Sequence, residues 1–167
     1  MKIPARLAAL AAVAAACGCA LFRGNGSVAT VVSPDGRNEI RLYLRPFSYE
    51  VRRDGRTMVA RSAIALRVDG KHLGRDIENV APVVSSGRLL GRVPTPVYKK
   101  ARISQNGYEA HVDFGRWAVR LVARDDGVAY RFETKFGERI RINGERADVT
   151  VPVASARGWA HFTDRFG

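Results

Sequence analysis

The sequence predicts an all-β protein, an antiparallel β-sandwich, on the strength of three observations. After residue 27, apolar and polar residues alternate in short runs, which is the period of half-buried strands. Gly, Asp, Asn and Pro separate these runs at intervals of about 8 to 12 residues, as in sandwiches. No window of this part has the three-to-four-residue spacing of an amphipathic helix.

The most regular runs predict a hairpin in the second half of the chain. Residues 117–124 alternate between apolar and polar, and so do residues 128–133. Asp125-Asp126-Gly127 lies between them, where Gly accepts a positive φ and Asp tolerates it. We therefore expect a tight turn in which Asp125 and Asp126 point apart and are turn residues first.

The first third of the chain is expected to form short strands joined by tight turns. Pro34 presets φ for a turn at 33–36, and Gly55 and Gly70 each follow an Asp at later turns. The predicted strands are 28–32, 40–45, 47–52, 57–60 and 66–68.

The middle of the chain is less regular. Several Pro and Gly residues occur between 70 and 96, so we expect loop there, with one short strand around 80–84. Asn106-Gly107, after the run 97–103, is the strongest short hairpin signal of the chain.

The last predicted strands follow that signal. The run 108–114 alternates and leads into the central hairpin. Beyond the hairpin, Asn143-Gly144 separates the apolar runs 140–142 and 147–151.

Residues 1–20 have the pattern of an export signal. Two basic residues precede an uninterrupted apolar run, 7–16, which is too short to span a bilayer of about 30 Å as a helix. Small residues before Cys17 and Cys19 resemble a lipoprotein lipobox, which predicts acylation of Cys17 or Cys19. The alternative is ordinary signal-peptide cleavage near Ala20.

This leader sets the expected organisation and location. Residues 21–27 are a tether, and 28–167 are one β domain, exported to the periplasm or the outer membrane and anchored by lipid. Because both cysteines precede the domain, the domain has no disulfide and no cysteine-based site.

The composition is strongly basic, with 28 Lys and Arg against 16 Asp and Glu. A basic domain can bind nucleic acid, an anionic polysaccharide or a membrane surface. The arginines are scattered, often at alternate strand positions, which favours solvated strand faces over a binding stripe. Nucleic acid is not expected as a partner, because the leader exports the chain.

The residues alone indicate no catalytic site. His72, His111 and His161 are not at the spacing of metal ligands, and we expect each to face solvent. The sequence has no phosphate-binding glycine loop and no Gly-x-Ser-x-Gly elbow.

Several short motifs occur in order between about residues 30 and 162. They are Ser33-Pro34-Asp35-Gly36, the strand with Tyr49, Val51 and Gly55, Pro96-Val97-Tyr98, Tyr108-Glu109, the string from Arg124 to Phe132, and Glu145 heading a strand to Pro152, with Trp159 beyond. In this order they resemble the N-terminal domain of glycoside hydrolase family 97.

The resemblance implies a β-supersandwich that precedes a catalytic (β/α)8 barrel and a C-terminal β-domain. Family members are similar to retaining and inverting α-glucosidases and α-galactosidases, and the barrel carries their catalytic carboxylates. We therefore expect this chain, which ends at Gly167 with its sandwich incomplete, to be no enzyme by itself. Its expected partners are a catalytic barrel and carbohydrate.

One site residue follows from the resemblance. Glu145 resembles the glutamate with which this domain reaches the barrel and helps to hold calcium. Calcium takes about six to eight oxygen ligands, so we expect Glu145 to be a ligand only when a barrel is present, and the isolated chain to bind no cofactor. The other interpretation is a surface turn carboxylate beside Asn143-Gly144.

Two functions are thus predicted. The first is the non-catalytic N-terminal portion of an exported glycoside hydrolase, packing on its barrel and contributing to carbohydrate binding. The alternative is a stand-alone basic surface lipoprotein that binds an anionic polysaccharide or another acidic partner through its arginines.

Overall fold

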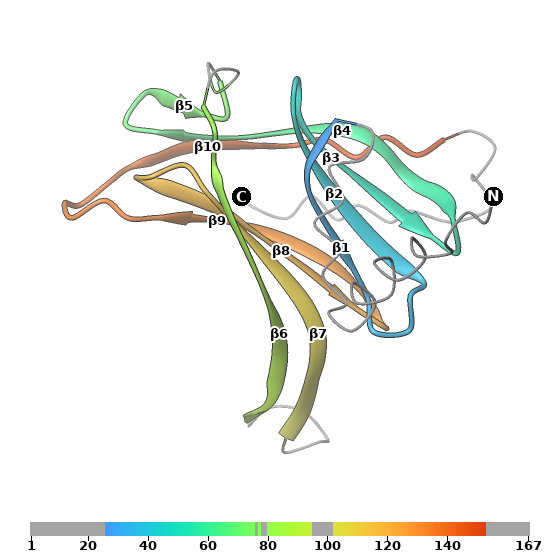
Figure 1. Cartoon of the computed structure of the whole chain (residues 1–167). Helices are drawn as coiled ribbons and strands as arrows, with labels where there is room; N and C mark the ends of the chain where they lie inside the picture. Colours follow the sequence, from blue (N-terminus) through green and yellow to red (C-terminus); the bar gives the residue numbers. More distant parts are fainter. Residues whose placement is uncertain (1–25, 76, 78–79, 95–101, 153–167) are drawn as a thin grey trace, which may run out of the picture.

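The chain forms two antiparallel β-sheets packed face to face, which confirms the predicted fold class (Figure 1). The computed structural model describes residues 26–75, 77, 80–94 and 102–152. Cys17, Cys19, His161 and Trp159 lie outside these residues, so what was expected of them stays a prediction. No helix in the described part has the length and hydropathy needed to cross a bilayer.

The first sheet has six strands in the order β1-β2-β3-β4-β10, with β5 paired to β4. The long strand β4 organises this sheet, because β3 pairs with its first half while β5 and β10 pair with its second half. The strands are β1 (Ser27–Val32), β2 (Asn38–Leu44), β3 (Phe47–Arg53), β4 (Arg56–Val68), β5 (Lys71–Leu73) and β10 (Ile142–Ala147).

The second sheet has four strands in sequence order. Residues 107–113 of β7 pair with β8, but residues 102–106 pair only with β6. The far ends of β6 and β7 therefore project from the body as a two-stranded ribbon (Figure 1). The strands are β6 (Val83–Pro94), β7 (Arg102–Asp113), β8 (Trp117–Arg124) and β9 (Gly127–Thr134).

The core lies where β1 and β2 face β7, β8 and β9. Alternation puts every second side chain of these strands between the sheets, and each fully buried aliphatic side chain contributes about 1.5–3 kcal/mol. The buried cluster comprises Ala29, Val31, Ile40, Leu42, Phe47, Tyr49, Ile64, Ile77, Ala110, Val112, Trp117, Val119, Leu121 and Ala123.

Phe47 joins the two sheets at one end of this core. Its ring meets Trp117 edge to face at 5.8 Å between centroids, and Trp117 stacks on Phe114 at 4.1 Å. Gly74 approaches Phe47 so closely that a Cβ there would lie 2.4 Å from the ring, and its φ is +97°. Only glycine satisfies both conditions at this position.

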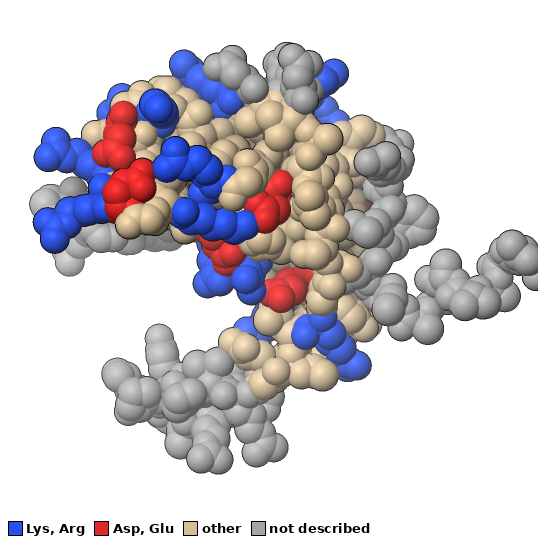
Figure 2. Space-filling model, turned by 60° about the vertical axis from the view of Figure 1, so that its left-hand side comes forward, with Lys and Arg blue, Asp and Glu red and all other residues tan. Residues whose placement is uncertain are grey.

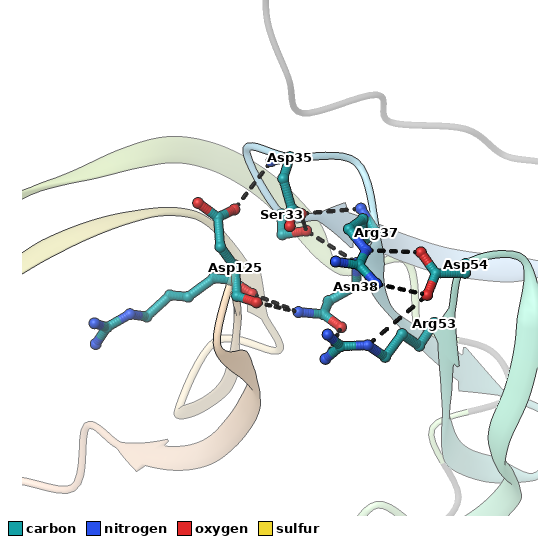
Figure 3. A network of polar contacts seen from close by, with 8 residues as sticks. Ser33, Asp35, Arg37, Asn38, Arg53, Asp54 and Asp125 are labelled. Atoms are coloured by element: carbon teal, nitrogen blue, oxygen red, sulfur yellow. Dashed lines mark hydrogen bonds and ion pairs between the residues drawn. The ribbon is translucent and has the colours of Figure 1, made fainter.

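Asn38 joins the sheets at the other end (Figure 3). This residue is 4% exposed, and its amide donates hydrogen bonds to the carbonyl oxygens of Arg124 (2.9 Å) and Asp125 (3.0 Å) in the β8–β9 turn. The backbone N–H of Asp35 in turn donates to the Asp125 carboxylate at 2.9 Å. Asp125 thus occupies a turn, as predicted, and also docks one sheet on the other.

The long strand β6 contradicts the prediction of loop over 70–96. Twelve consecutive residues of β6 pair with β7, and Gly87 and Gly91 sit inside this ladder. Pro94 is tolerated because it lies at the end of an edge strand, where its missing N–H leaves no bond unmade. Backbone pairing with β7, which lies far along the chain, overrides the local signal for loop.

Both Asn-Gly pairs lie inside strands, so the predicted hairpin at Asn106-Gly107 and the break at Asn143-Gly144 are wrong. At Gly107 a Cβ would lie 2.8 Å from the carbonyl oxygen of Ala123, so glycine is needed for close approach of β8. Gly144 follows a bulge in the pairing of β10 with β4. The strands predicted at 57–60 and 66–68 are likewise parts of one strand, β4.

Tyr43 is buried on the face that alternation assigns to solvent. Only 2% of the residue is exposed, because the Arg61 guanidinium lies over its ring, 3.6 Å from the centroid. The Tyr43 hydroxyl donates to Glu50 at 2.7 Å. Polar neighbours thus bury this aromatic ring outside the core.

We expect Asn38→Ala to lower the free energy of unfolding by about 2 kcal/mol, because it removes two hydrogen bonds between the sheets. Urea denaturation of both proteins measures the difference. The matched control is Asn106→Ala, an exposed asparagine, which should change the value by no more than about 0.5 kcal/mol. Equal losses in the two variants would contradict the role given to Asn38.

The two Asn-Gly pairs offer a second comparison. Gly107→Ala forces a Cβ against the β8 backbone and should lower the free energy of unfolding by about 1–3 kcal/mol. Gly144→Ala meets no atom within 4 Å and should leave stability unchanged or slightly higher. Thermal unfolding of both variants tests this, and a tolerated Gly107→Ala would refute the close-approach explanation.

Candidate functional site

The candidate site is an open seam between the two sheets, bordered by β9 and β10. In the described part of the chain, β9 pairs only with β8 and β10 only with β4, so both strands are free along their outer sides. At this border a hollow of about 370 Å³ with a mainly apolar lining lies between strands β2, β3 and β4 of the first sheet and β9 of the second. Its lining residues are Ile40, Tyr49, Val51, Val59, Val128, Ala129, Tyr130 and Val149.

Tyr49 and Tyr130 meet across this hollow, one from each sheet. Their ring centroids are 5.1 Å apart, and the Tyr49 hydroxyl donates to the backbone carbonyl of Asp148 at 3.1 Å. Burial, with smaller contributions from Glu145, Tyr49 and Asp148, raises the pKa of Tyr130 to about 12. Both phenols are therefore neutral at physiological pH and offer an apolar ring with a polar tip.

Glu145 lies on β10, within a strand and not in a turn. It pairs directly with Leu66 of β4, and directly opposed residues share one face of a sheet. Leu66 is buried on the inner face, so Glu145 is on that face too, yet it is exposed. An exposed carboxylate on the inner face of a sheet marks the place where the second sheet no longer covers the first.

The described residues alone do not build a calcium site around Glu145. No group of three or more His, Cys, Asp or Glu residues converges among them. One carboxylate supplies at most two of the about six to eight oxygens that calcium takes. Any such site would need ligands from outside the described residues, and calcium in an intact enzyme stays a prediction of the resemblance.

The outer face of β7–β9 carries paired charges. Arg120 lies 3.0 Å from Glu109 and 2.8 Å from Glu133, and His111 lies 3.1 Å from Glu133. Although partial burial opposes it, hydrogen bonding from Arg131 and the charge of Arg120 lower the pKa of Glu133. His111 thus lies on a polar face, as expected, and His72 is exposed.

Sequence reasoning placed the inward residues of β9 correctly but missed the seam. Val128 and Tyr130 alternate toward the core as predicted, and Val149 follows β10 beside them. Alternation says which side chains face inward, but not whether a neighbouring strand continues the sheet beyond them. The edge position of β9 and β10 leaves no local signal in the sequence.

The family model described as "Glycosyl-hydrolase 97 N-terminal" matches residues 31–166, which confirms the resemblance seen in the motifs. No curated protein matches the chain.

Solved structures agree in fold. A glycoside hydrolase family 97 enzyme from Pseudoalteromonas sp. strain K8, in complex with panose, matches with a TM-score of 0.58, 21% identity, and coverage of 75% of this chain and 21% of that one. The acarbose complex from the same organism matches with a TM-score of 0.53 and 21% identity, and the match covers 70% of this chain and 19% of that one. A beta-arabinopyranosidase matches with a TM-score of 0.61 and 17% identity, and the match covers 74% of this chain and 21% of that one. The chain thus spans about a fifth of the solved structures it matches.

The tyrosine at the seam yields a pH prediction. Because the pKa of Tyr130 is raised to about 12, its neutral form is favoured in the folded state. The stability that this contributes is complete below about pH 10, the usual tyrosine value, and is lost as pH rises toward 12. Denaturation between pH 9 and 12 should show this fall, and Tyr130→Phe should reduce it. If the stability of Tyr130→Phe fell as steeply between pH 9 and 12 as that of the wild type, the role given to the buried Tyr130 hydroxyl would be contradicted.

Proposed function

The chain belongs to the glycosyl-hydrolase 97 N-terminal family, and from this premise we propose that it is the non-catalytic N-terminal portion of an exported glycoside hydrolase. In this role it packs on a catalytic barrel and contributes to carbohydrate binding. The observation that carries the proposal is the open seam, where two strands whose outer sides have no partner among the described residues, an apolar hollow and an inward-facing carboxylate occur together.

The seam has the properties of a surface that a neighbour covers. Unpaired edge strands invite pairing with another chain segment, and an exposed apolar hollow favours burial. Val149 and Val151 are 46% and 47% exposed at its border. A neighbouring domain that packs here removes this apolar surface from water and completes hydrogen bonds along β9 or β10.

The two tyrosines support a contribution to carbohydrate binding. An aromatic ring packs against the apolar face of a sugar, and a neutral phenol hydroxyl donates to or accepts from sugar hydroxyls. Tyr49 already uses its hydroxyl proton on Asp148, so Tyr130 is the freer of the two. The structurally similar enzymes with bound panose and acarbose support carbohydrate as the ligand class of the intact enzyme.

Glu145 supplies the charged group of the seam. In the described structure it forms no ion pair; the nearby Asp148 does, with Arg146 at 2.6 Å. An exposed carboxylate beside an apolar hollow suits a partner surface that brings a positive charge or hydrogen-bond donors. We infer that Glu145 acts across the interface and that the chain without a barrel performs no hydrolysis.

A chimera tests this function. The chain replaces the matched N-terminal segment of the Pseudoalteromonas enzyme, and hydrolysis of p-nitrophenyl α-glucoside is measured. We expect the chimera to be active, the 167-residue chain alone to give no turnover, and Glu145→Gln in the chimera to lower kcat/KM by about tenfold or more, which corresponds to about 1.4 kcal/mol.

Glu138→Gln is the matched control, because Glu138 is an exposed carboxylate that pairs with Arg116 at 2.9 Å and does not line the hollow of the seam. It should leave kcat/KM unchanged. Turnover by the isolated chain would overturn the non-catalytic role, and a Glu145→Gln chimera with full activity would remove Glu145 from the interface.

A further inference from the structure

A second, polar hollow lies at the end of the molecule away from the seam's apolar lining. It measures about 620 Å³ and is lined by Asp69 of the β4–β5 turn and by Arg139, Ile140, Arg141 and Asn143 before and within β10. Figure 2 turns the left-hand side of Figure 1 forward and shows many lysine and arginine side chains on this face, with aspartates and glutamates among them. We call the residues that line this hollow, together with Arg67, the basic hollow.

Hydrogen bonds hold the backbone of the basic hollow in place. The N–H of Asp69 donates to the carbonyl oxygen of Arg141 (2.9 Å), and the N–H of Arg141 donates to the Asp69 carboxylate (3.0 Å). The N–H of Gly70 donates to the side-chain oxygen of Asn143 (2.9 Å), and the Arg67 guanidinium donates to the backbone carbonyl oxygen of Asn143 (3.1 Å). The origin of the Arg141 side chain is therefore fixed, which reduces the ordering cost of binding.

Two of the cations here, Arg139 and Arg141, have no partner among the described residues. Within the described residues, the side chains of Arg139 and Arg141 form no hydrogen bond, ion pair or ring contact, and both residues are exposed. By contrast, Arg116 pairs with Glu138 and Arg131 with Glu133. An arginine left without a carboxylate in a hollow keeps its full capacity to bind an anion.

The donors of the basic hollow suit a carboxylate or a sulfate. A guanidinium presents a planar fork that matches two oxygens of such a group. The amide oxygen of Asn143 accepts from Gly70, so its NH2 group remains a donor toward the hollow. Asp69, the one carboxylate in the lining, is bonded to the backbone of Arg141.

Positive charge continues from this hollow across the strands. Arg67 lines a neighbouring hollow of about 170 Å³, where it lies with His72 of β5 and Arg146 of β10. Glu145 and Gly144 of β10 and Ala65 of β4 complete that lining. Arg67 connects the two hollows, because it lines the smaller one and donates to Asn143 of the larger one. Two connected hollows fit successive units of a polymer better than a single small anion.

We propose that the basic hollow binds an anionic glycan through its carboxylate or sulfate groups. The inference rests on the proposed function for the choice of a glycan over other polyanions. Arg139 and Arg141 bind the charged groups, Asn143 donates to a neighbouring oxygen, and Arg67 extends the contact toward β5. The binding is electrostatic, so it weakens as salt rises and the Debye length falls.

Affinity electrophoresis of the full 167-residue chain in detergent tests this proposal. Gels contain polygalacturonate, dextran sulfate or neutral dextran. We expect retardation by the carboxylated or the sulfated polymer but not by dextran, and the two acidic gels distinguish the two anion chemistries. Arg139→Ala/Arg141→Ala should weaken the apparent affinity by about tenfold or more, which corresponds to about 1.4 kcal/mol.

The control is Arg56→Ala/Arg88→Ala, which removes the same charge at exposed positions of β4 and β6 outside the basic hollow. It should keep most of the affinity, and thermal unfolding should show that all variants are folded. Equal losses of affinity in the two double variants would show that binding depends on net charge alone and would refute the proposed site.

Other outcomes also decide the matter. Absence of retardation in both acidic gels overturns the proposal, and so does binding to anionic phospholipid vesicles without binding to either acidic glycan. The inference and the proposed function fail separately. If the chimera is active but neither acidic glycan retards the chain, only the proposal for the basic hollow is refuted. If an acidic glycan retards the chain but the chimera is inactive, only the barrel-packing role is refuted.

Discussion

The buried amide of Asn38 fixes one sheet against the other, and the rest of the structure depends on that fixed position. Hydrophobic contact between the sheets provides most of the stabilisation but is non-directional. The two bonds from Asn38 to the β8–β9 turn, and the bond from Asp35 to Asp125, are directional and select one alignment (Figure 3). With this alignment β9 stops short of covering β4 and β10, and the seam remains open.

The open seam links the fold to the proposed function. A complete sandwich would bury the inner face of β10, where a carboxylate without a partner is costly. Here Glu145 shares a face with buried Leu66 yet remains exposed. Charges that point inward at an edge also discourage unwanted pairing. The same features that protect this edge in isolation are what a catalytic neighbour would contact.

Two groups of arginines in this basic chain differ in a way that composition does not show. Those on the outer face of β7–β9 are paired with Glu109 and Glu133 across strands, where exposed pairs contribute little to stability. Arg139 and Arg141 have no such partners in the described structure. The expectation of solvated strand faces therefore holds for the first group, while the second is arranged for an anion that the chain itself does not provide.

By itself the sequence determined the alternation of the strands, the turn at Asp125-Asp126-Gly127 and the family, because period-two patterning and turn motifs are local properties. Only the tertiary structure decided that Asn106-Gly107 and Asn143-Gly144 lie inside strands and that β6 is long. The physical reason is that a glycine required by a neighbouring backbone looks, in sequence, like a glycine required by a turn. The seam and the basic hollow were decided in the same way, since edges and unpaired charges depend on which distant residues come to lie beside them.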